Sequence, residues 1–153
     1  MRKTFEHPAI TTDVIVGFPG ETAEEFETTR AFLEKVKFYE MHVFKYSKRK
    51  GTRAAVMENQ IPEPVKTQRS NVLIAMDEKD TAIFREYYLG KEAEVLLEEK
   101  KEIGGQEYWI GHTKEYVKVA LLDDGQDYAN YLVKGIITQT FNKEMLLMEQ
   151  SDI

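Results

Sequence analysis

The segment that most restricts the fold of this chain spans residues 10–22 and reads Ile-Thr-Thr-Asp-Val-Ile-Val-Gly-Phe-Pro-Gly-Glu-Thr. Residues 10–16 are rich in β-branched side chains and end in an apolar run, which predicts a strand covered on both faces in a parallel sheet. Two glycines then bracket a Phe-Pro pair, so bare backbone N–H groups lie at the carboxyl end of the strand, where parallel α/β folds bind ligands. Thr22 and Glu25 have the spacing of a capping box, which predicts a helix start. An ordinary βα turn without a ligand is the alternative reading.

The string at residues 13–22 resembles the fifth-strand segment of the radical S-adenosylmethionine enzymes, and its form is similar to that of the methylthiotransferase branch. The resemblance implies that the turn lies against the adenosine part of S-adenosylmethionine. The residues that would line this pocket are Ile15, Gly17, Phe18, Pro19, Gly20 and Glu21.

Composition is typical of a soluble globular protein, with 42% hydrophobic and 31% charged residues among 153. We find no signal peptide and no apolar run as long as a membrane span, so we expect a cytoplasmic protein. The net charge of −6 lies in the second part of the chain, because residues 89–153 hold 7 Lys+Arg against 13 Asp+Glu. Any nucleic-acid contact there would need a local basic patch. There is no cysteine, which excludes disulfides and a thiolate-held cluster within this chain.

A helix is predicted from Thr22 to about Lys37 and a second strand over residues 38–46, which together complete a right-handed parallel β-α-β unit. The loop that follows, residues 45–53, carries five positive charges and no negative one. A solvated charged loop is one interpretation. Its place beside the first turn, at a strand's carboxyl end, favours contact with phosphate or substrate.

Within this loop, the pattern Tyr-Ser-x-Arg-x-Gly-Thr-x-Ala-Ala at residues 46–55 resembles the signature after the sixth barrel strand of the MiaB-like tRNA methylthiotransferases. Residues 48–52 are most similar to the branch that acts on threonylcarbamoyl-adenosine beside the anticodon. The resemblance implies that Tyr46, Ser47 and Arg49 meet the cofactor or substrate. It implies RNA contacts from Lys45, Lys48, Arg49, Lys50 and Arg53. Lys45 and Arg53 depart from the branch, which often has proline at both positions; both changes add positive charge.

A long helix is predicted from Val65 to about Tyr88, with a stripe of Val65, Arg69, Val72, Met76, Ile83 and Tyr87 widened by Leu73 and Phe84. Gly90 suits its end, and the pattern then changes to period 2. We expect strands at residues 92–98, 106–111, 116–121, 132–140 and 144–148, forming a small antiparallel barrel of the oligonucleotide-binding type. Residues 89–119 resemble a TRAM domain, a small RNA-binding barrel. The predicted class is α+β, with one domain at residues 1–88 and another at 89–153.

On the barrel, His112, Lys114, Tyr116 and Lys118 combine an aromatic ring with donors, which favours stacking a base and binding phosphate. The alternative is that Tyr116 caps the barrel and the lysines are solvated. Tyr108 and Trp109 alternate along a strand, so one should be core and the other exposed.

The chain itself offers little for catalysis. Its three histidines lack metal-ligand spacing, and neither Ser47 nor Ser70 lies in a nucleophile elbow. Radical chemistry needs an iron–sulfur cluster held by thiolates, which this chain lacks. We therefore expect the C-terminal part of a larger tRNA methylthiotransferase: the last β-α-β-α portion of a TIM-like radical barrel, cut at residues 1–9, followed by the TRAM barrel.

The resemblance implies a parent enzyme that uses S-adenosylmethionine and two 4Fe-4S clusters to methylthiolate a modified adenosine next to the anticodon of tRNA. The chain alone should bind none of these cofactors and should be inactive. It should self-associate through unpaired strand edges. Two alternatives stay open. One is a fragment of the branch that modifies an aspartate of a ribosomal protein. The other is a nucleic-acid-binding adaptor that performs no chemistry.

Overall fold

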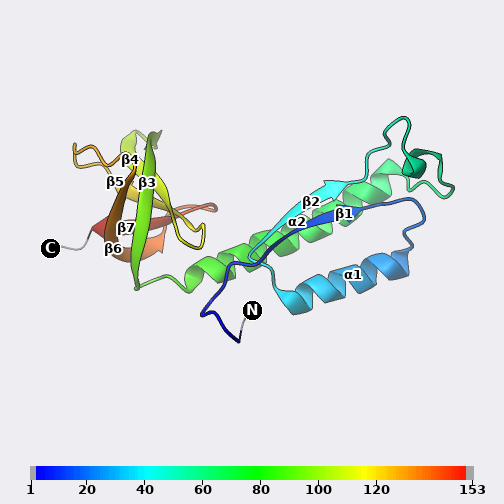
Figure 1. Cartoon of the computed structure of the whole chain (residues 1–153), viewed down its shortest axis with the longest axis horizontal. Coiled ribbons are helices and arrows are strands. Elements are labelled where there is room, and N and C mark those ends of the chain that lie inside the picture. Colours follow the sequence, from blue (N-terminus) through cyan, green and yellow to red (C-terminus); the bar gives the residue numbers. More distant parts are fainter. Residues whose placement is uncertain (1–2, 151–153) are drawn as a thin grey trace. The chain divides into compact units, whose positions relative to one another are not determined.

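A computed structural model describes residues 3–150 and divides them into two compact units. One unit comprises residues 9–81, and the other comprises residues 3–8 with 82–150. Helices and strands both contribute, which confirms the α+β class (Figure 1). None of the described helices is long and apolar enough to cross a membrane.

The 9–81 unit is built on a parallel β-α-β unit, as predicted. Strand β1 (Thr11–Val16) leads through helix α1 (Ala23–Val36) to strand β2 (Glu40–Lys45), and the strands pair in parallel from Thr11 opposite Glu40 to Val16 opposite Lys45. The predicted capping box is confirmed: the Thr22 hydroxyl accepts from the Glu25 N–H at 3.1 Å, and the Glu25 carboxylate accepts from the Thr22 N–H at 2.8 Å. The helix therefore begins where the sequence indicates.

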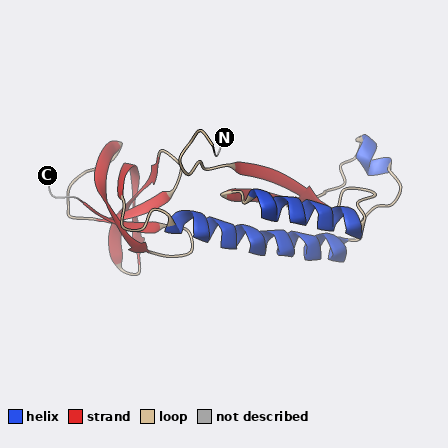
Figure 2. Cartoon of the chain, turned by 90° about the horizontal axis from the view of Figure 1, so that it is seen from below, coloured by secondary structure: helices blue, strands red, loops and turns tan. Residues whose placement is uncertain are grey.

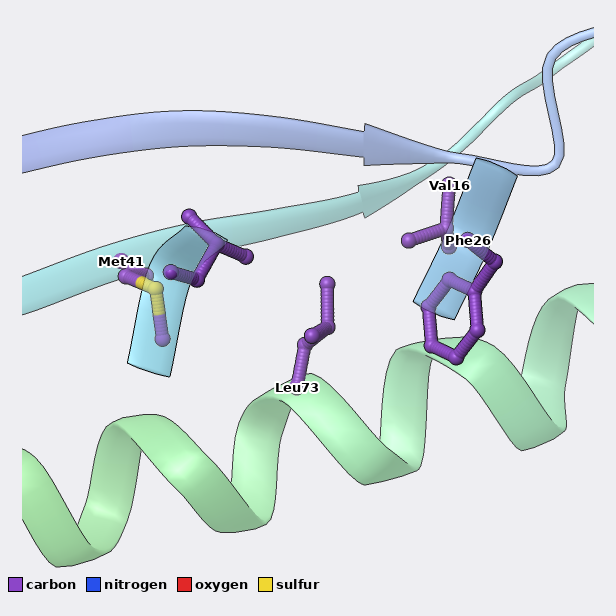
Figure 3. Close-up of a cluster of buried hydrophobic side chains, with 5 residues drawn as sticks. Val16, Phe26, Met41 and Leu73 are labelled. Atoms are coloured by element: carbon purple, nitrogen blue, oxygen red, sulfur yellow. The ribbon is translucent and has the colours of Figure 1, made fainter. Parts of the chain in front are cut away.

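Both helices cover the same face of this two-stranded sheet (Figure 2). Val16 and Met41 face them from the strands, and Phe26 of α1 and Leu73 of helix α2 (Glu63–Glu86) meet them in one cluster with Leu33 (Figure 3). Leu73 is fully buried, so truncating it to alanine should cost about 2–5 kcal/mol. This cluster fixes the strands, and hence the loops at their carboxyl ends, against α2.

The expectation that the first strand is covered on both faces is wrong. Ile15 and its register partner Phe44 are 58% and 53% exposed on the face that neither helix touches. The reason is that α1 and α2 both pack on one side, so alternate residues of β1 and β2 face outward. We call this surface the helix-free face; it consists of Thr11, Asp13, Ile15, Glu40, His42 and Phe44.

Helix α2 starts two residues before the predicted Val65. Its buried residues in the 9–81 unit are Arg69, Ser70 and Leu73, whereas Val72 of the predicted stripe is 39% exposed. The predicted stripe is thus confirmed at Arg69 and Leu73 and wrong at Val72, because the helix faces only two strands and packs along a narrow line. A short 3-10 helix, η1 (Arg53–Val56), lies between β2 and α2.

The other unit contains a closed barrel of five strands in the order β3-β4-β5-β7-β6. The strands are β3 (Glu92–Ile103), β4 (Gln106–Thr113), β5 (Lys118–Leu122), β6 (Tyr131–Thr140) and β7 (Leu146–Gln150). The prediction of an antiparallel barrel is wrong at one pair, because β5 and β7 run parallel, with Val119 opposite Leu146. A closed ring with an odd number of strands cannot alternate direction throughout, so one neighbouring pair must be parallel.

Three local expectations about the barrel also need correction. Strand β3 continues past Glu98 to Ile103, with a bulge between Leu97 and Glu99. Tyr116 precedes β5 instead of starting it, because its φ of 64° belongs to a turn. Trp109 is the core residue of the Tyr-Trp pair, at 4% exposure, but Tyr108 is half-buried against Phe141, 4.7 Å between ring centroids, and is not exposed.

Candidate ligand-binding loops

Two loops lie side by side at the carboxyl edge of the β1–β2 pair. We call residues 17–21 the glycine loop and residues 45–53 the basic loop. The Tyr46 N–H donates to the Val16 carbonyl at 2.9 Å, and the Phe18 and Tyr46 rings meet edge to face at 5.3 Å between centroids. Because parallel strands end at the same edge, residues almost thirty positions apart in sequence form one surface.

The glycine loop has a shape that only glycine permits at its two ends. Gly17 and Gly20 have φ values of 72° and 89°. The Gly20 N–H donates to the Asn59 carbonyl at 2.9 Å, and Pro19 is buried while Phe18 is 45% exposed. A cavity of about 550 Å³ adjoins this loop and is lined by Phe18, Pro19, Gly20, Glu21, Glu25, Thr28 and Thr29.

Gly17 also lies against a side chain of α2. A β-carbon built on Gly17 would lie 2.2 Å from Cγ of Lys66. The Lys66 ammonium in turn donates to the Tyr46 carbonyl at 3.0 Å and pairs with Glu63 at 3.2 Å. One lysine therefore touches both loops.

The carboxylate of Glu21 is turned into its own loop. Its Oε2 accepts from the Gly17 N–H at 2.6 Å and from Nη1 of Arg69 at 2.5 Å, and the same guanidinium nitrogen donates to the Glu21 carbonyl at 3.0 Å. Arg69 is only 8% exposed and lies over the Phe26 ring at 5.4 Å. Neither Arg69 nor Lys66 could be assigned to the loop from sequence, because their positions on α2 relative to Gly17 depend on tertiary packing.

Apolar side chains lie beside the loops on the helix-free face. Ile15 and Phe44 are register partners near the carboxyl ends of their strands, and Phe18 is exposed in the glycine loop. Phe44 was not among the predicted site residues. The alternation of residues in β2 predicts that Phe44 lies on the face opposite to Met41 and Val43. Its pairing with Ile15 is visible only in the register of the two strands.

The cations of the basic loop divide into two groups. Lys45 is held by α2, with its ammonium 2.6 Å from the Glu63 carboxylate and 3.3 Å from the Thr67 hydroxyl. The hydrogen bond from Lys45 is the main cause of the lowered pKa of Glu63. Four others are exposed and have no carboxylate partner among residues 3–150: Lys48, Arg49, Lys50 and Arg53. Only this second group is free to bind an anion.

Two further predicted residues of the basic loop differ in environment. Ser47 is exposed. The Tyr46 hydroxyl is buried and finds no hydrogen-bond partner in the described part of the chain. A buried hydroxyl without a protein partner is uncommon in folded proteins, and a water molecule or a ligand would satisfy it.

The barrel unit has a separate groove of about 550 Å³ that holds three of the four predicted RNA-binding residues. His112 and Tyr116 have ring centroids 5.7 Å apart, Tyr116 is 78% exposed, and Lys114 lies next to them. Lys118 is the register partner of His112 but does not line the groove. Four glutamates also line it: Glu92, Glu94, Glu98 and Glu115. Glu98 contacts Nδ1 of His112 at 2.7 Å.

The groove is therefore more acidic than its predicted residues indicated. Its lining contains four carboxylates and only two ammonium groups, those of Lys91 and Lys114. Sequence reasoning chose the basic and aromatic residues of one hairpin and missed the glutamates that β3 contributes. Tyr116 still offers an exposed ring for stacking.

The described residues contain no cluster of His, Asp or Glu that could hold a metal ion, and the sequence has no cysteine. The residues of this chain therefore do not fit a thiolate-held iron–sulfur cluster.

No family model matches the chain. Threonylcarbamoyladenosine tRNA methylthiotransferase MtaB of Bacillus subtilis is 44% identical over 120 residues, which cover 78% of this chain and 27% of the relative. The tRNA-2-methylthio-N(6)-dimethylallyladenosine synthase of Acetivibrio thermocellus is 50% identical over 90 residues, 59% of this chain and 19% of the relative. Ribosomal protein uS12 methylthiotransferase RimO of Clostridium kluyveri is 40% identical over 102 residues, 67% of this chain and 23% of the relative.

The chain thus spans about a quarter or less of the length of each of these relatives. They include enzymes named for tRNA and for a ribosomal protein, and all three matches exceed the identity at which homology is in doubt. By sequence, the chain belongs to the methylthiotransferase family.

Proposed function

We propose that this chain is the C-terminal segment of a radical S-adenosylmethionine tRNA methylthiotransferase that modifies an adenosine next to the anticodon. Residues 1–88 would form the last β-α-β-α portion of a TIM-like barrel, and residues 89–153 a TRAM barrel of the oligonucleotide-binding type. The observation that carries the proposal is the adjacency of the glycine loop and the basic loop at one strand edge, where parallel α/β folds bind ligands.

The helix-free face supports the same reading. In a TIM-like barrel the helices surround the strands, and inward-facing side chains fill the interior. β1 and β2 have helices on one face only, and the opposite face carries exposed Ile15 and Phe44. Further strands of the proposed parent would enclose that face. The side chains of Ile15 and Phe44 would then lie inside the barrel, next to the glycine loop and the basic loop.

Within the proposed pocket, Ile15, Phe44 and Phe18 would pack against the adenosine part of S-adenosylmethionine, and the open backbone of Gly17–Gly20 would allow close approach. When bound beside a reduced iron–sulfur cluster, S-adenosylmethionine supplies the radical that activates the substrate. Residues outside this chain would hold the two clusters, since this chain has no cysteine. We accordingly propose that the chain alone performs no turnover. Deoxyadenosine formed by purified chain with iron, sulfide and S-adenosylmethionine would refute this.

For tRNA, the free cations of the basic loop are the proposed phosphate contacts. Lys48, Arg49, Lys50 and Arg53 are exposed without carboxylate partners among the described residues, whereas Lys45 is occupied by Glu63. Tyr116 would stack a base on the barrel unit. Because the barrel groove is acidic, we assign most of the electrostatic affinity to the basic loop.

A salt titration of tRNA binding tests this assignment. Each lost phosphate contact lowers the slope of log affinity against log salt by about 0.7–0.9. Replacing Lys50 by alanine should lower the slope by about that amount. The matched control is Lys45→Ala, five residues away in the same loop but tied to α2, which should change the slope much less. Equal effects of the two variants, or a slope near zero for the unmodified chain, would refute the proposed role of the loop.

One observation favours a second candidate, the branch that modifies a ribosomal protein. The groove lined by Glu92, Glu94, Glu98 and Glu115 suits a basic protein segment better than a phosphate backbone. Titrating the chain with a tRNA anticodon stem-loop and, separately, with the ribosomal protein named for the RimO relative distinguishes the two. Binding of the protein through the groove, without binding of RNA, would select the second candidate.

We also propose that the isolated chain self-associates. β1 and β2 pair only with each other in the described structure, so each has an outer edge, and the helix-free face exposes Ile15 and Phe44. Light scattering across a range of concentrations should show an increase in mass. A constant monomer mass would refute this.

A further inference from the structure

We propose that Arg69 is a positioning residue that holds the glycine loop in its ligand-ready shape through the carboxylate of Glu21. The role in ligand binding rests on the proposed function. The structural role does not, and the two are tested separately below.

The hydrogen bonds of Glu21 converge on a single carboxylate oxygen. One oxygen, Oε2, receives both the Gly17 N–H at 2.6 Å and the Arg69 guanidinium at 2.5 Å. The carboxylate therefore ties Gly17, which directly follows β1, to the N-terminal third of α2. Arg69 also binds the Glu21 carbonyl at 3.0 Å, so it fixes the backbone as well as the side chain.

Burial makes this contact decisive for the loop. The side chains of Arg69 and Glu21 are 9% and 15% exposed. A charge buried to this degree without its partner is strongly unfavourable, whereas a paired and hydrogen-bonded charge is tolerated. The side chain of Glu21 thus stays folded against the glycine loop only while Arg69 is present. When this side chain moves, the Gly17 N–H loses its acceptor.

The pairing also limits what the loop can recognise. Because Arg69 neutralises Glu21 and Oε2 already receives the Gly17 and Arg69 donors, only Oε1 of this carboxylate is left to accept from a ligand hydroxyl or amino group. The other groups left for a ligand are the Phe18 ring and the backbone around Gly20, next to Ile15 and Phe44. These favour a flat, uncharged ring such as adenine over a charged group.

Lys66, one turn before Arg69 on α2, contacts the basic loop as well as the glycine loop. Its methylene chain packs on Gly17 and its ammonium binds the Tyr46 carbonyl at 3.0 Å. Two cationic side chains of one helix thus hold both loops. Arg69 is the stronger test because it is more deeply buried and makes two hydrogen bonds to one residue.

Amide hydrogen exchange of the 153-residue chain tests the structural part. The readout is the exchange rate of the Gly17 amide relative to that of Met41, whose N–H is bound by Asp77 at 2.6 Å in the same unit. A loss of global stability accelerates both amides, so it leaves the ratio unchanged. Arg69→Gln should raise the ratio by about tenfold or more, as expected when a charge-assisted hydrogen bond is released.

Two further variants sharpen the result. Arg69→Lys should restore part of the protection, because an ammonium still neutralises Glu21. Lys79→Gln, which removes an exposed cation of α2 outside both loops, should leave the ratio unchanged. If Arg69→Gln does not fold, the double variant Glu21→Gln/Arg69→Gln removes both buried charges and should fold. Accelerated exchange of Gly17 in either glutamine variant supports the proposal. A ratio equal to that of the unmodified chain overturns it.

The ligand part uses S-adenosylhomocysteine as the probe and the amide signals of Phe18 and Gly20 as the readout. Shifts in the unmodified chain and in Lys79→Gln that weaken severalfold in Arg69→Gln support the positioning role in binding. Equal shifts in all three chains overturn it. If no shift occurs in any chain while the Gly17 ratio changes, the structural role of Arg69 holds and the proposed adenosine site fails.

Discussion

Replacing Gly17 by alanine should destabilise the 9–81 unit more than replacing Gly20 by alanine. Both glycines have positive φ values, 72° and 89°, a conformation that costs an L-residue about 1–2 kcal/mol. Part of this cost is offset, since alanine restricts the unfolded chain by about 0.4–1 kcal/mol. Gly20 has no atom within 4 Å of an added β-carbon, so its replacement should cost about 1 kcal/mol in total.

At Gly17 the added methyl group also has to displace Lys66. The nearest atoms are Cγ and Cδ, 2.2 and 2.8 Å away, and they cannot move freely because the ammonium of Lys66 is bound to the Tyr46 carbonyl. Overpacking of this kind costs about 1–3 kcal/mol. We therefore expect Gly17→Ala to cost about 2 kcal/mol more than Gly20→Ala.

Urea unfolding followed at 222 nm reports on α1 and α2, while fluorescence reports on the barrel through Trp109, the single tryptophan. The helical transition should move in Gly17→Ala and the fluorescence transition should not. The double variant Gly17→Ala/Lys66→Ala removes the clash, so its loss should fall short of the sum of the single losses. Equal stability of Gly17→Ala and Gly20→Ala, within about 0.5 kcal/mol, would refute the reasoning.

Three other outcomes follow from single contacts. Tyr46→Phe should leave the helical transition unchanged or raise stability by up to about 1 kcal/mol, since the buried hydroxyl has no partner among the described residues; a clear loss would reveal one. Gly111→Ala should destabilise the barrel by about 3 kcal/mol or more, measured by Trp109 fluorescence, because the added β-carbon would lie 2.0 Å from the Leu96 carbonyl oxygen. Gly125→Ala is the control, since no atom lies within 4 Å of its added β-carbon. Equal losses of stability in the two variants would contradict the close approach at Gly111. The hydrogen bond from Lys100 holds the pKa of Asp123 below its usual 3.8, so the carboxylate stabilises the folded barrel above that pH and this contribution disappears as the pH falls through and below it. The unfolding midpoint should therefore drop between about pH 5 and pH 3 more in the unmodified chain than in Asp123→Asn, and equal drops would contradict the assignment.

Local patterns predicted the local elements of this fold well. The capping box at Thr22 and Glu25, the alternation of Met41 and Val43 in β2, and the turn at Gly90 all depend on residues close in sequence. The number of barrel strands followed from the same kind of pattern.

Features that depend on residues far apart in the sequence could not be predicted from local patterns. The parallel β5–β7 pair arises from closing a ring of five strands, which no strand's own sequence reveals. The pairing of Glu21 with Arg69, 48 positions away, depends on how α2 packs across β1. The exposure of Ile15 depends on which face of the sheet both helices cover, and its apolar character alone indicated burial instead.

The order of strands in the barrel has a kinetic consequence. β7 lies between β5 and β6, and β3 pairs with both β4 and β6, so the ring joins the first strand to the fourth and the third to the fifth. Such pairings between remote segments slow folding, because the intervening chain has to be ordered before they form. The backbone hydrogen bonds of α1 and α2 join near neighbours, so these helices should appear within the first phase of a refolding experiment, with Trp109 burial following in a slower one.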